Sequence, residues 1–184
     1  MDKLTKAGLV CMVAHEAVGQ RRKYTDEPYY EHPFAVVDIL EDWGIKDEDV
    51  LSAALLHDVI EDTRITYEFL LQLFGKRIAG LVLEVTDVSK PEDGNRTVRK
   101  RIDKKHLAQA SAEGQTIKLA DLIHNTRSIV KHDPGFARLY LREKEELLQV
   151  LTKGDPGLLE AAWAVLRESR EKLNENRKAG STSG

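Results

Sequence analysis

The residues best suited to chemistry are two imidazoles and two neighbouring sets of carboxylates. The candidate metal ligands are His32, His57, Asp58 and Asp121, and a second acidic pair, Glu61 and Asp62, lies one helical turn beyond His57 and Asp58. Imidazole nitrogens and carboxylate oxygens are ligands that divalent transition metals bind. Carboxylates that do not bind the metal can take up the proton of an attacking water. The set therefore indicates metal-dependent hydrolysis.

The His57 segment is predicted to lie on one helix over residues 48–61. His57 shares a helical face with Val50, Ala53 and Ala54, so its ring should point into the core or into a cleft. Burying several carboxylates beside it is costly unless a cation compensates their charge. The alternative interpretation is a surface helix end with unrelated charges, which the apolar face of His57 disfavours.

Asp121 interrupts an apolar helix, and Lys118 and Asn125 lie one turn to either side of it. Taken alone, Asp121 can be explained as a structural ion pair with Lys118. His32 alone proves little, because a histidine before a proline often marks only the start of a helix. Together these positions are much more specific than any one of them.

The bulk composition is that of an ordinary soluble domain. The chain has 184 residues, of which 41% are hydrophobic and 32% charged, so one domain with a real core is expected. A net charge of -3 predicts no general nucleic-acid surface, and no apolar run is long enough to span a bilayer. The single Cys11 lies in an apolar stretch, which favours a core residue over a nucleophile and is typical of a reducing, cytoplasmic location.

The elements that must position these residues are helical almost throughout, which predicts an all-α class. Helices are expected over residues 3–20, 33–43, 48–61, 66–75, 76–88, 97–111, 115–130, 136–153 and 156–175. Asp47, Thr66 and Asp155 are the expected N-caps, and Gly44 and Gly75 the expected helix ends. Residues 1–175 would form one domain, residues 176–184 a flexible tail, and the polar loop 89–96 a mobile lid.

The chain resembles the HD-domain metal-dependent phosphohydrolases, and among them the branch that hydrolyses the alarmones ppGpp and pppGpp. That branch includes the hydrolase domains of bifunctional stringent-response enzymes and the small Mesh-type hydrolases. The resemblance covers about residues 5–153. Its matching segments are Arg-Arg-Lys at 21–23, Pro-Tyr-Tyr-Glu-His-Pro at 28–33, Ala-Leu-Leu-His-Asp-Val-Ile-Glu-Asp-Thr at 54–63, Phe-Gly-Lys at 74–76, Leu-Glu-Val-Thr at 83–86, and Ile-Lys-Leu-Ala-Asp at 117–121 with Asn125.

The resemblance implies a single HD-domain helical bundle with a central metal site. It implies that one Mn²⁺ is held by His32, His57, Asp58 and Asp121. Glu61 and Asp62 would orient or deprotonate the attacking water, with Asn125 near the metal or the scissile phosphate. The implied substrate contacts are Arg22, Lys23, Lys118 and Tyr140. The implied reaction releases pyrophosphate from the 3′ position of ppGpp or pppGpp and leaves GDP or GTP.

Several alternatives stay open at the level of sequence. The cations at 21–23 and the basic stretch from Arg96 to His106 are equally interpreted as solvated helix surface. The loop at 90–99 is longer and more polar than the resemblance predicts. The resemblance also predicts an aromatic residue closer to Glu146 that encloses the nucleotide, and Tyr140 would have to serve in its place. Another nucleotide, such as a nucleoside triphosphate or the 2′-phosphate of NADPH, is therefore the second hypothesis. A nucleotide-binding module without turnover is the third.

The metal and the assembly are also not fixed by the residues. The same nitrogen and oxygen ligands suit Fe²⁺, Zn²⁺ or Ni²⁺ as well as Mn²⁺. A homo-oligomer is left open. No synthetase domain is expected after the hydrolase region, so the chain should degrade alarmone and not make it.

Overall fold

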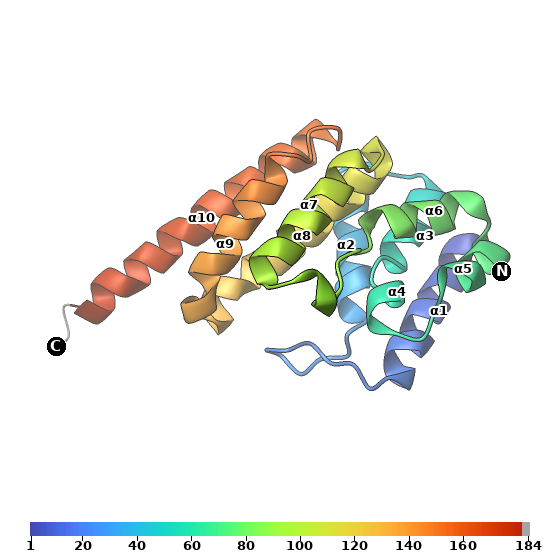
Figure 1. Cartoon of the computed structure of the whole chain (residues 1–184), viewed down its shortest axis with the longest axis horizontal. Helices are drawn as coiled ribbons and strands as arrows, with labels where there is room; N and C mark the ends of the chain where they lie inside the picture. The colour runs from blue at the N-terminus through green and yellow to red at the C-terminus, as the bar shows by residue number, and fades with distance from the viewer. Residues whose placement is uncertain (182–184) are drawn as a thin grey trace.

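The computed structural model describes the backbone of residues 1–181 and the side chains of residues 1–175. The described part is all-α, as predicted, and contains no strand beyond one isolated bridge between Arg21 and Pro28. Figure 1 shows the helices in chain order. They are α1 (Lys3–Ala17), α2 (Glu31–Asp42), α3 (Glu48–Leu55), α4 (Val59–Asp62), α5 (Tyr67–Phe74), α6 (Lys76–Val85), the short 3₁₀ turn η1 (Pro91–Asp93), α7 (Arg96–Gln109), α8 (Ala112–His132), α9 (Pro134–Leu148) and α10 (Pro156–Ser181).

Helix α8 is the centre of the bundle, and it packs against α2, α3, α6, α9 and α10. Its buried residues face several directions, which is expected of a helix surrounded by others. Figure 1 shows α9 and α10 on one side of α8, and α1 and α5 on the other. A charged residue in the middle of α8, such as Asp121, is therefore carried into the interior.

The predicted helix ends are confirmed where a cap was identified. Asp47 accepts from the amides of Asp49 and Val50, and Thr66 accepts from the amide of Phe69. Asp155 accepts from the amide of Leu158. Gly44 and Gly75 have positive φ angles of 79° and 83°, a conformation that favours glycine at a helix end.

The helix expected over residues 48–61 is wrong as a single element, because the chain turns between α3 and α4. The amides of Leu56 and His57 donate to the carbonyls of Ala53 and Ala54, three residues back, which tightens the backbone. The His57 ring lies over the same turn, with Nδ1 2.7 Å from the Ala54 carbonyl oxygen. His57 and Asp58 therefore lie in a turn, and Glu61 and Asp62 lie on a separate short helix.

Several other boundaries differ from the prediction. Helices α1 and α6 end earlier than expected, at Ala17 and Val85, and α9 ends at Leu148. Helix α8 begins at Ala112, because Ser111 caps it. Helix α10 continues to Ser181, past the end expected near 175. For the predicted tail, side chains from 176 and all of residues 182–184 lie outside the described residues. The domain boundary itself stays a prediction.

Two further features bear on function. Cys11 is buried, as predicted, and its burial raises the pKa of the thiol to about 12. Within residues 1–181, no helix combines the length and apolarity needed to cross a membrane.

Candidate metal centre and active site

Three segments bring the candidate ligands together. His32 lies in the first turn of α2, His57 and Asp58 lie in the turn between α3 and α4, and Asp121 lies on α8. One ligand atom from each of His32, His57 and Asp58 lies within 4.8 Å of the other two. Asp121 Oδ1 lies 3.1 Å from His32 Nε2 and 3.8 Å from His57 Nε2. The described residues thus contain a His-His-Asp group that could hold a metal ion, with a second aspartate beside it.

The two histidines are oriented as metal ligands are. His57 Nδ1 donates to the Ala54 carbonyl, which leaves the lone pair of Nε2 directed at the cluster. His32 Nδ1 lies 2.7 Å from His124 Nδ1, and burial lowers the pKa of His124 to about 4, so neutral His124 can accept this hydrogen bond. The Nε2 atoms of His32 and His57 are both buried without a hydrogen-bond partner. Two orphaned imidazole nitrogens facing carboxylates fit a divalent cation.

The charges of the cluster depend strongly on one another. Burial lowers the pKa of His57, but the carboxylates of Asp58 and Asp121 outweigh it and raise this pKa to about 9. Burial favours protonation of Asp58, but the adjacent His57 outweighs it and holds the pKa of Asp58 below its usual range. Without a metal, a proton shared in the cluster supplies the positive charge that the carboxylates need. A divalent ion can replace that proton.

Asp121 faces two partners at once. Its Oδ1 faces His32, while its Oδ2 accepts from Lys118 Nζ at 2.8 Å. Burial lowers the pKa of Lys118, but Asp121, Glu61 and Asp87 outweigh it and raise this pKa above its usual range. The structural ion pair considered for Asp121 is therefore present, and the other carboxylate oxygen, Oδ1, faces the histidines and also accepts from Asn125 Nδ2. The two interpretations of Asp121 are compatible.

The acidic pair lies on α4, the short helix that directly follows His57 and Asp58 in the chain. Glu61 Oε1 accepts from the backbone amide of Asp87, and Asp62 Oδ2 accepts from Gln20 Nε2 at 2.9 Å. Although both residues are exposed, partial desolvation of the Glu61 carboxyl raises its pKa to about 7, with Asp87 adding to the rise and Lys118 opposing it. A carboxylate with this pKa is suited to accepting a proton near neutral pH.

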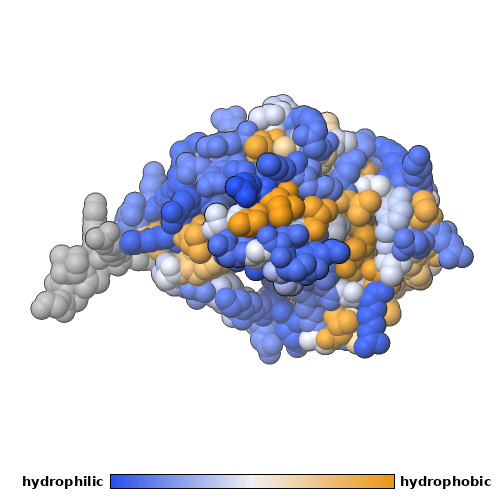
Figure 2. Space-filling model, in the orientation of Figure 1, coloured by the Kyte–Doolittle hydropathy of each residue, from blue (hydrophilic) through white to orange (hydrophobic). Residues whose placement is uncertain are grey.

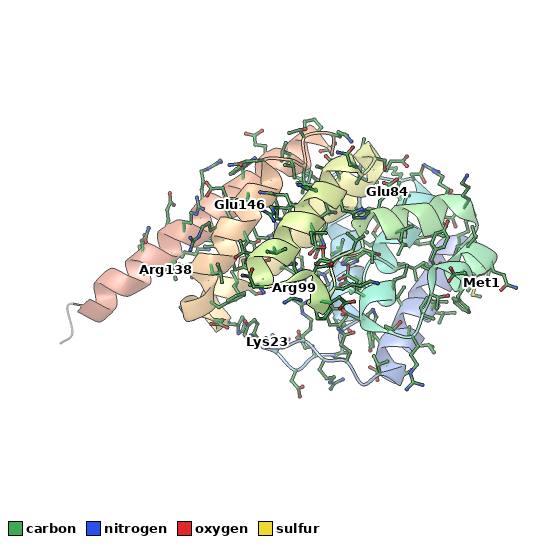
Figure 3. The ribbon with its side chains drawn as sticks, in the orientation of Figure 1. Met1, Lys23, Glu84, Arg99, Arg138 and Glu146 are labelled. Carbon is green, nitrogen blue, oxygen red and sulfur yellow. The ribbon has the colours of Figure 1, made fainter. Side chains whose placement is uncertain are left out.

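A cavity of about 380 Å³ opens beside the candidate ligands. Asp58, Asp121 and Asn125 lie at its base, and helices α7 and α9 form its sides. We call the five cations from these two helices the cationic wall: Lys100, Arg101, Lys104, Arg142 and Lys144. Figure 3 labels Arg99 on α7 and Glu146 on α9, which locate the two helices, and Figure 2 shows that hydrophilic side chains dominate this face. Its size and charge suit a phosphorylated small molecule.

Comparison with known proteins places this geometry in a family. A family model described as an HD domain matches residues 10–152. The chain belongs to the HD-domain family. A solved structure described with the words "a metazoan ortholog of SpoT hydrolyzes ppGpp" superposes with a TM-score of 0.81 and 32% identity. The superposition covers 91% of this chain and 96% of that one.

Curated relatives of this HD-domain chain carry concordant names. The guanosine-3′,5′-bis(diphosphate) 3′-pyrophosphohydrolase MESH1 of Danio rerio is 34% identical over 168 residues, which cover 89% of each protein. The bifunctional (p)ppGpp synthase/hydrolase SpoT of Escherichia coli is 39% identical over 154 residues, which cover 82% of this chain and 21% of SpoT. The chain thus spans about a fifth of the length of the long relatives. The HD domain and these names support a metal-dependent hydrolase.

The predicted substrate residues of the HD domain are placed differently from one another. Arg22 Nη2 donates to Asn125 Oδ1 at 3.2 Å, and Asn125 Nδ2 donates to Asp121 Oδ1 at 2.6 Å, so both reach the metal centre. Lys118 lines the cavity. Lys23, labelled in Figure 3, instead contacts Tyr24 and Asp133. Tyr140 does not line the cavity, and its hydroxyl is buried without a partner.

Sequence reasoning missed several residues that the fold brings to the site. Tyr29 donates to Asp58 Oδ2 at 2.7 Å, and the tyrosine pair before Pro33 could have suggested it. Asp87 pairs with Lys100 at 2.8 Å. Lys144 lines the cavity, and burial together with neighbouring Lys118 lowers its pKa to about 8. No sequence pattern marks Lys144, because it lies in an ordinary charged stretch of α9.

The predicted lid is tied down at its start. The carboxylate of Asp103, itself 3% exposed, accepts from the amides of Val88 and Ser89 and from the Ser89 hydroxyl. Movement of the loop therefore stays a prediction, and any movement would begin beyond Ser89.

Proposed function

We propose that this HD-domain chain is a Mn²⁺-dependent guanosine-3′,5′-bis(diphosphate) 3′-pyrophosphohydrolase. It would convert ppGpp or pppGpp and water into GDP or GTP and pyrophosphate. The observation that carries the proposal is the pair of partnerless His32 and His57 Nε2 atoms facing carboxylates beside a cationic cavity. The names of the MESH1 and SpoT relatives point to the same substrate.

The proposed ligands are His32, His57, Asp58 and Asp121. When bound, the metal would polarise the scissile phosphoryl group and acidify the attacking water. These side chains would lose less conformational entropy on binding a cation than exposed side chains would. Burial and the hydrogen bonds to Ala54, His124 and Lys118 already fix three of the four.

The proton would be handled by the acidic pair. Glu61, with a pKa raised to about 7 by partial desolvation, would take a proton from water as the water oxygen bonds to phosphorus. The bond between phosphorus and the 3′-oxygen would break, and that oxygen would receive the proton and leave as the 3′-hydroxyl of GDP or GTP. Asp62 would orient the same water. Asn125 would hold Asp121, since its amide donates to that carboxylate at 2.6 Å.

The cationic wall would bind the phosphates of the substrate. Lys100 and Lys104 are each paired with a carboxylate at 2.8 Å, from Asp87 and Glu146, and those pairs would open to admit an anion. Lys118, Arg22 and Lys144 would add positive charge near the base of the cavity. Lys23 and Tyr140 would contact the nucleotide only after a local rearrangement.

A second candidate is hydrolysis of another nucleotide, such as a nucleoside triphosphate or NADPH. Tyr29 is the one aromatic residue among the described residues that line the cavity, so little aromatic surface is available to select a guanine base. A panel of ppGpp, pppGpp, nucleoside triphosphates and NADPH would decide between the two candidates. The first is contradicted if ppGpp ranks last.

The decisive experiment measures pyrophosphate release from ppGpp by chelator-stripped protein, with and without Mn²⁺. Glu61→Gln is run beside the wild type, since it keeps the shape and removes the base; we expect a loss of about 10²- to 10⁴-fold. Titration with Mn²⁺, Fe²⁺, Zn²⁺ and Ni²⁺ identifies the metal that supports turnover. Wild type that binds Mn²⁺ but releases no pyrophosphate would exclude the alarmone.

Two expectations accompany the proposal. A cytoplasmic location stays a prediction, which fractionation of cells tests. A homo-oligomer also stays open, and sedimentation of the purified chain measures it.

A further inference from the structure

His15 lies in the last turn of α1, outside the ligand set and outside the cavity, yet it contacts the site from behind. Its side chain is fully buried. Nδ1 lies 2.6 Å from Gln20 Oε1, and Nε2 is buried without any hydrogen-bond partner. A buried polar atom left without a partner is costly, so a purely structural position would more readily hold an apolar side chain.

A chain of hydrogen bonds leads from His15 to the acidic pair. An amide oxygen can only accept, so His15 Nδ1 must be the donor to Gln20. That bond turns the amide of Gln20 so that its NH₂ group faces Asp62 Oδ2, to which it donates at 2.9 Å. The opposite orientation would set the amide oxygen against the carboxylate. His15 therefore fixes which end of Gln20 meets Asp62.

A second connection leads from the same ring to the metal centre. The rings of His15 and Tyr29 pack with centroids 4.8 Å apart at an interplanar angle of 39°. The Tyr29 hydroxyl donates to Asp58 Oδ2 at 2.7 Å. The backbone ties the two connections together, because the Tyr29 amide donates to the Gln20 carbonyl and the Gln20 amide donates to the His15 carbonyl.

We propose that His15 is a positioning residue that sets Asp62 through Gln20 and supports the metal ligand Asp58 through Tyr29. The kinetic test of this proposal rests on the proposed hydrolysis of ppGpp. The test of the hydrogen bond between His15 and Gln20 does not depend on turnover. The described contacts place His15 behind the acidic pair and away from the cationic wall, so it should act on turnover and not on nucleotide binding.

Matched variants separate the two connections. His15→Phe keeps a ring against Tyr29 and removes the donor to Gln20. His15→Asn keeps a donor near the position of Nδ1 and removes the ring. Gln20→Met breaks the first connection without changing the buried histidine, so it tests the chain even if His15→Phe fails to fold.

In the Mn²⁺-loaded 184-residue chain, we expect His15→Phe and Gln20→Met each to lower kcat about 10- to 100-fold, the range for residues that orient functional groups, with KM unchanged. The double variant His15→Phe with Gln20→Met should have a kcat no lower than that of the slower single variant, because both substitutions break the same series of hydrogen bonds. His15→Asn should retain kcat within about threefold. Tyr29→Phe and His15→Asn, which removes the ring against Tyr29, should weaken Mn²⁺ binding in a titration of the metal alone, whereas His15→Phe should not.

The readout independent of turnover is nuclear magnetic resonance of the side chains. We expect His15 to carry a proton on Nδ1, and we expect a Gln20 NH₂ group whose slow exchange is lost in His15→Phe. Additive kinetic losses, an unchanged kcat in a folded His15→Phe, or a His15 without a proton on Nδ1 would each overturn the proposal. A wild type inactive on ppGpp would sink the proposed function alone, since the resonance data would still decide the role of His15.

Discussion

The ligand cluster and the cationic wall face the same cavity but are built in different ways. His32, His57 and Asp121 are at most 5% exposed, and each has one atom fixed by a neighbour. The wall consists of long side chains on α7 and α9, of which Lys100 and Lys104 are 38% and 29% exposed and paired with carboxylates. The cluster is preorganised by packing, whereas two lysines of the wall are held by partly solvated ion pairs.

This difference teaches which functions each region can serve. A buried cluster can hold a small cation in one geometry, because its side chains have few other conformations. A solvated wall can adapt to phosphates in several positions, because exchanging one ion pair for another costs little. Chemistry should therefore depend on the cluster, and substrate preference should depend on the wall.

The largest expected effect is at the cluster. Asp58→Asn keeps the size of the side chain and the contact with Tyr29 but removes a charge that the metal needs. Because a bound metal contributes several kcal/mol of transition-state stabilisation, we expect pyrophosphate release to fall by about 10³-fold or more. Inductively coupled plasma mass spectrometry should show less bound metal. Full activity with full metal content would refute Asp58 as a ligand.

The wall should show a smaller effect that depends on pH. Burial and nearby Lys118 and Lys100 lower the pKa of Lys144 to about 8, so its positive charge is present below that pH and lost above it. We expect KM to rise between about pH 7 and about pH 9, by about tenfold if the lost contact is worth about 1.4 kcal/mol. The measurement is KM across this range at constant ionic strength.

The control for that prediction is Lys144→Arg, whose guanidinium stays charged throughout the range. It should flatten the rise of KM, while Lys144→Met should give a high KM at every pH. If all three proteins show the same pH dependence, Lys144 has no part in binding.

Asp103 on α7, which anchors the start of the loop at Val88 and Ser89, should affect the stability of the fold. Asp103→Ala removes an acceptor from the Val88 and Ser89 amides and leaves those donors beside a cavity. We expect the free energy of unfolding to fall by about 1–3 kcal/mol, the usual cost of losing bonds to a charged group. Thermal unfolding measures it, with Asp103→Asn as the control that keeps one oxygen acceptor. Equal stability of wild type and Asp103→Ala would contradict the anchor.

The smallest effect should come from an ion pair outside both regions. Arg170 Nη2 lies 2.6 Å from Glu145 Oε2, and both side chains are more than a third exposed. Exposed ion pairs contribute only about 0–1 kcal/mol to stability. Arg170→Ala should therefore leave the rate of pyrophosphate release unchanged and shift the unfolding temperature by no more than a few degrees. A large loss of activity would show that α10 influences the wall.

The sequence by itself determined the all-α class and supplied the residues that we propose carry the chemistry. Periodicity and capping residues such as Asp47, Thr66 and Asp155 act within a few residues, so they can be interpreted without knowing the fold. The matching segments around His57 and Asp121 likewise indicated an HD domain, which the family comparison shows. Local physical chemistry was sufficient for these predictions.

Only the tertiary structure decided how the groups meet. The turn at His57 arises because its ring and amide both engage the Ala54 carbonyl, which a helical period does not reveal. The placement of Lys144 and Asp103 depends on which helices and loops pack together, and that of His15 on how the segment after α1 folds back to bring Gln20 and Tyr29 against its ring. The same packing separated Arg22, which reaches Asn125, from Lys23, its neighbour in sequence, which does not.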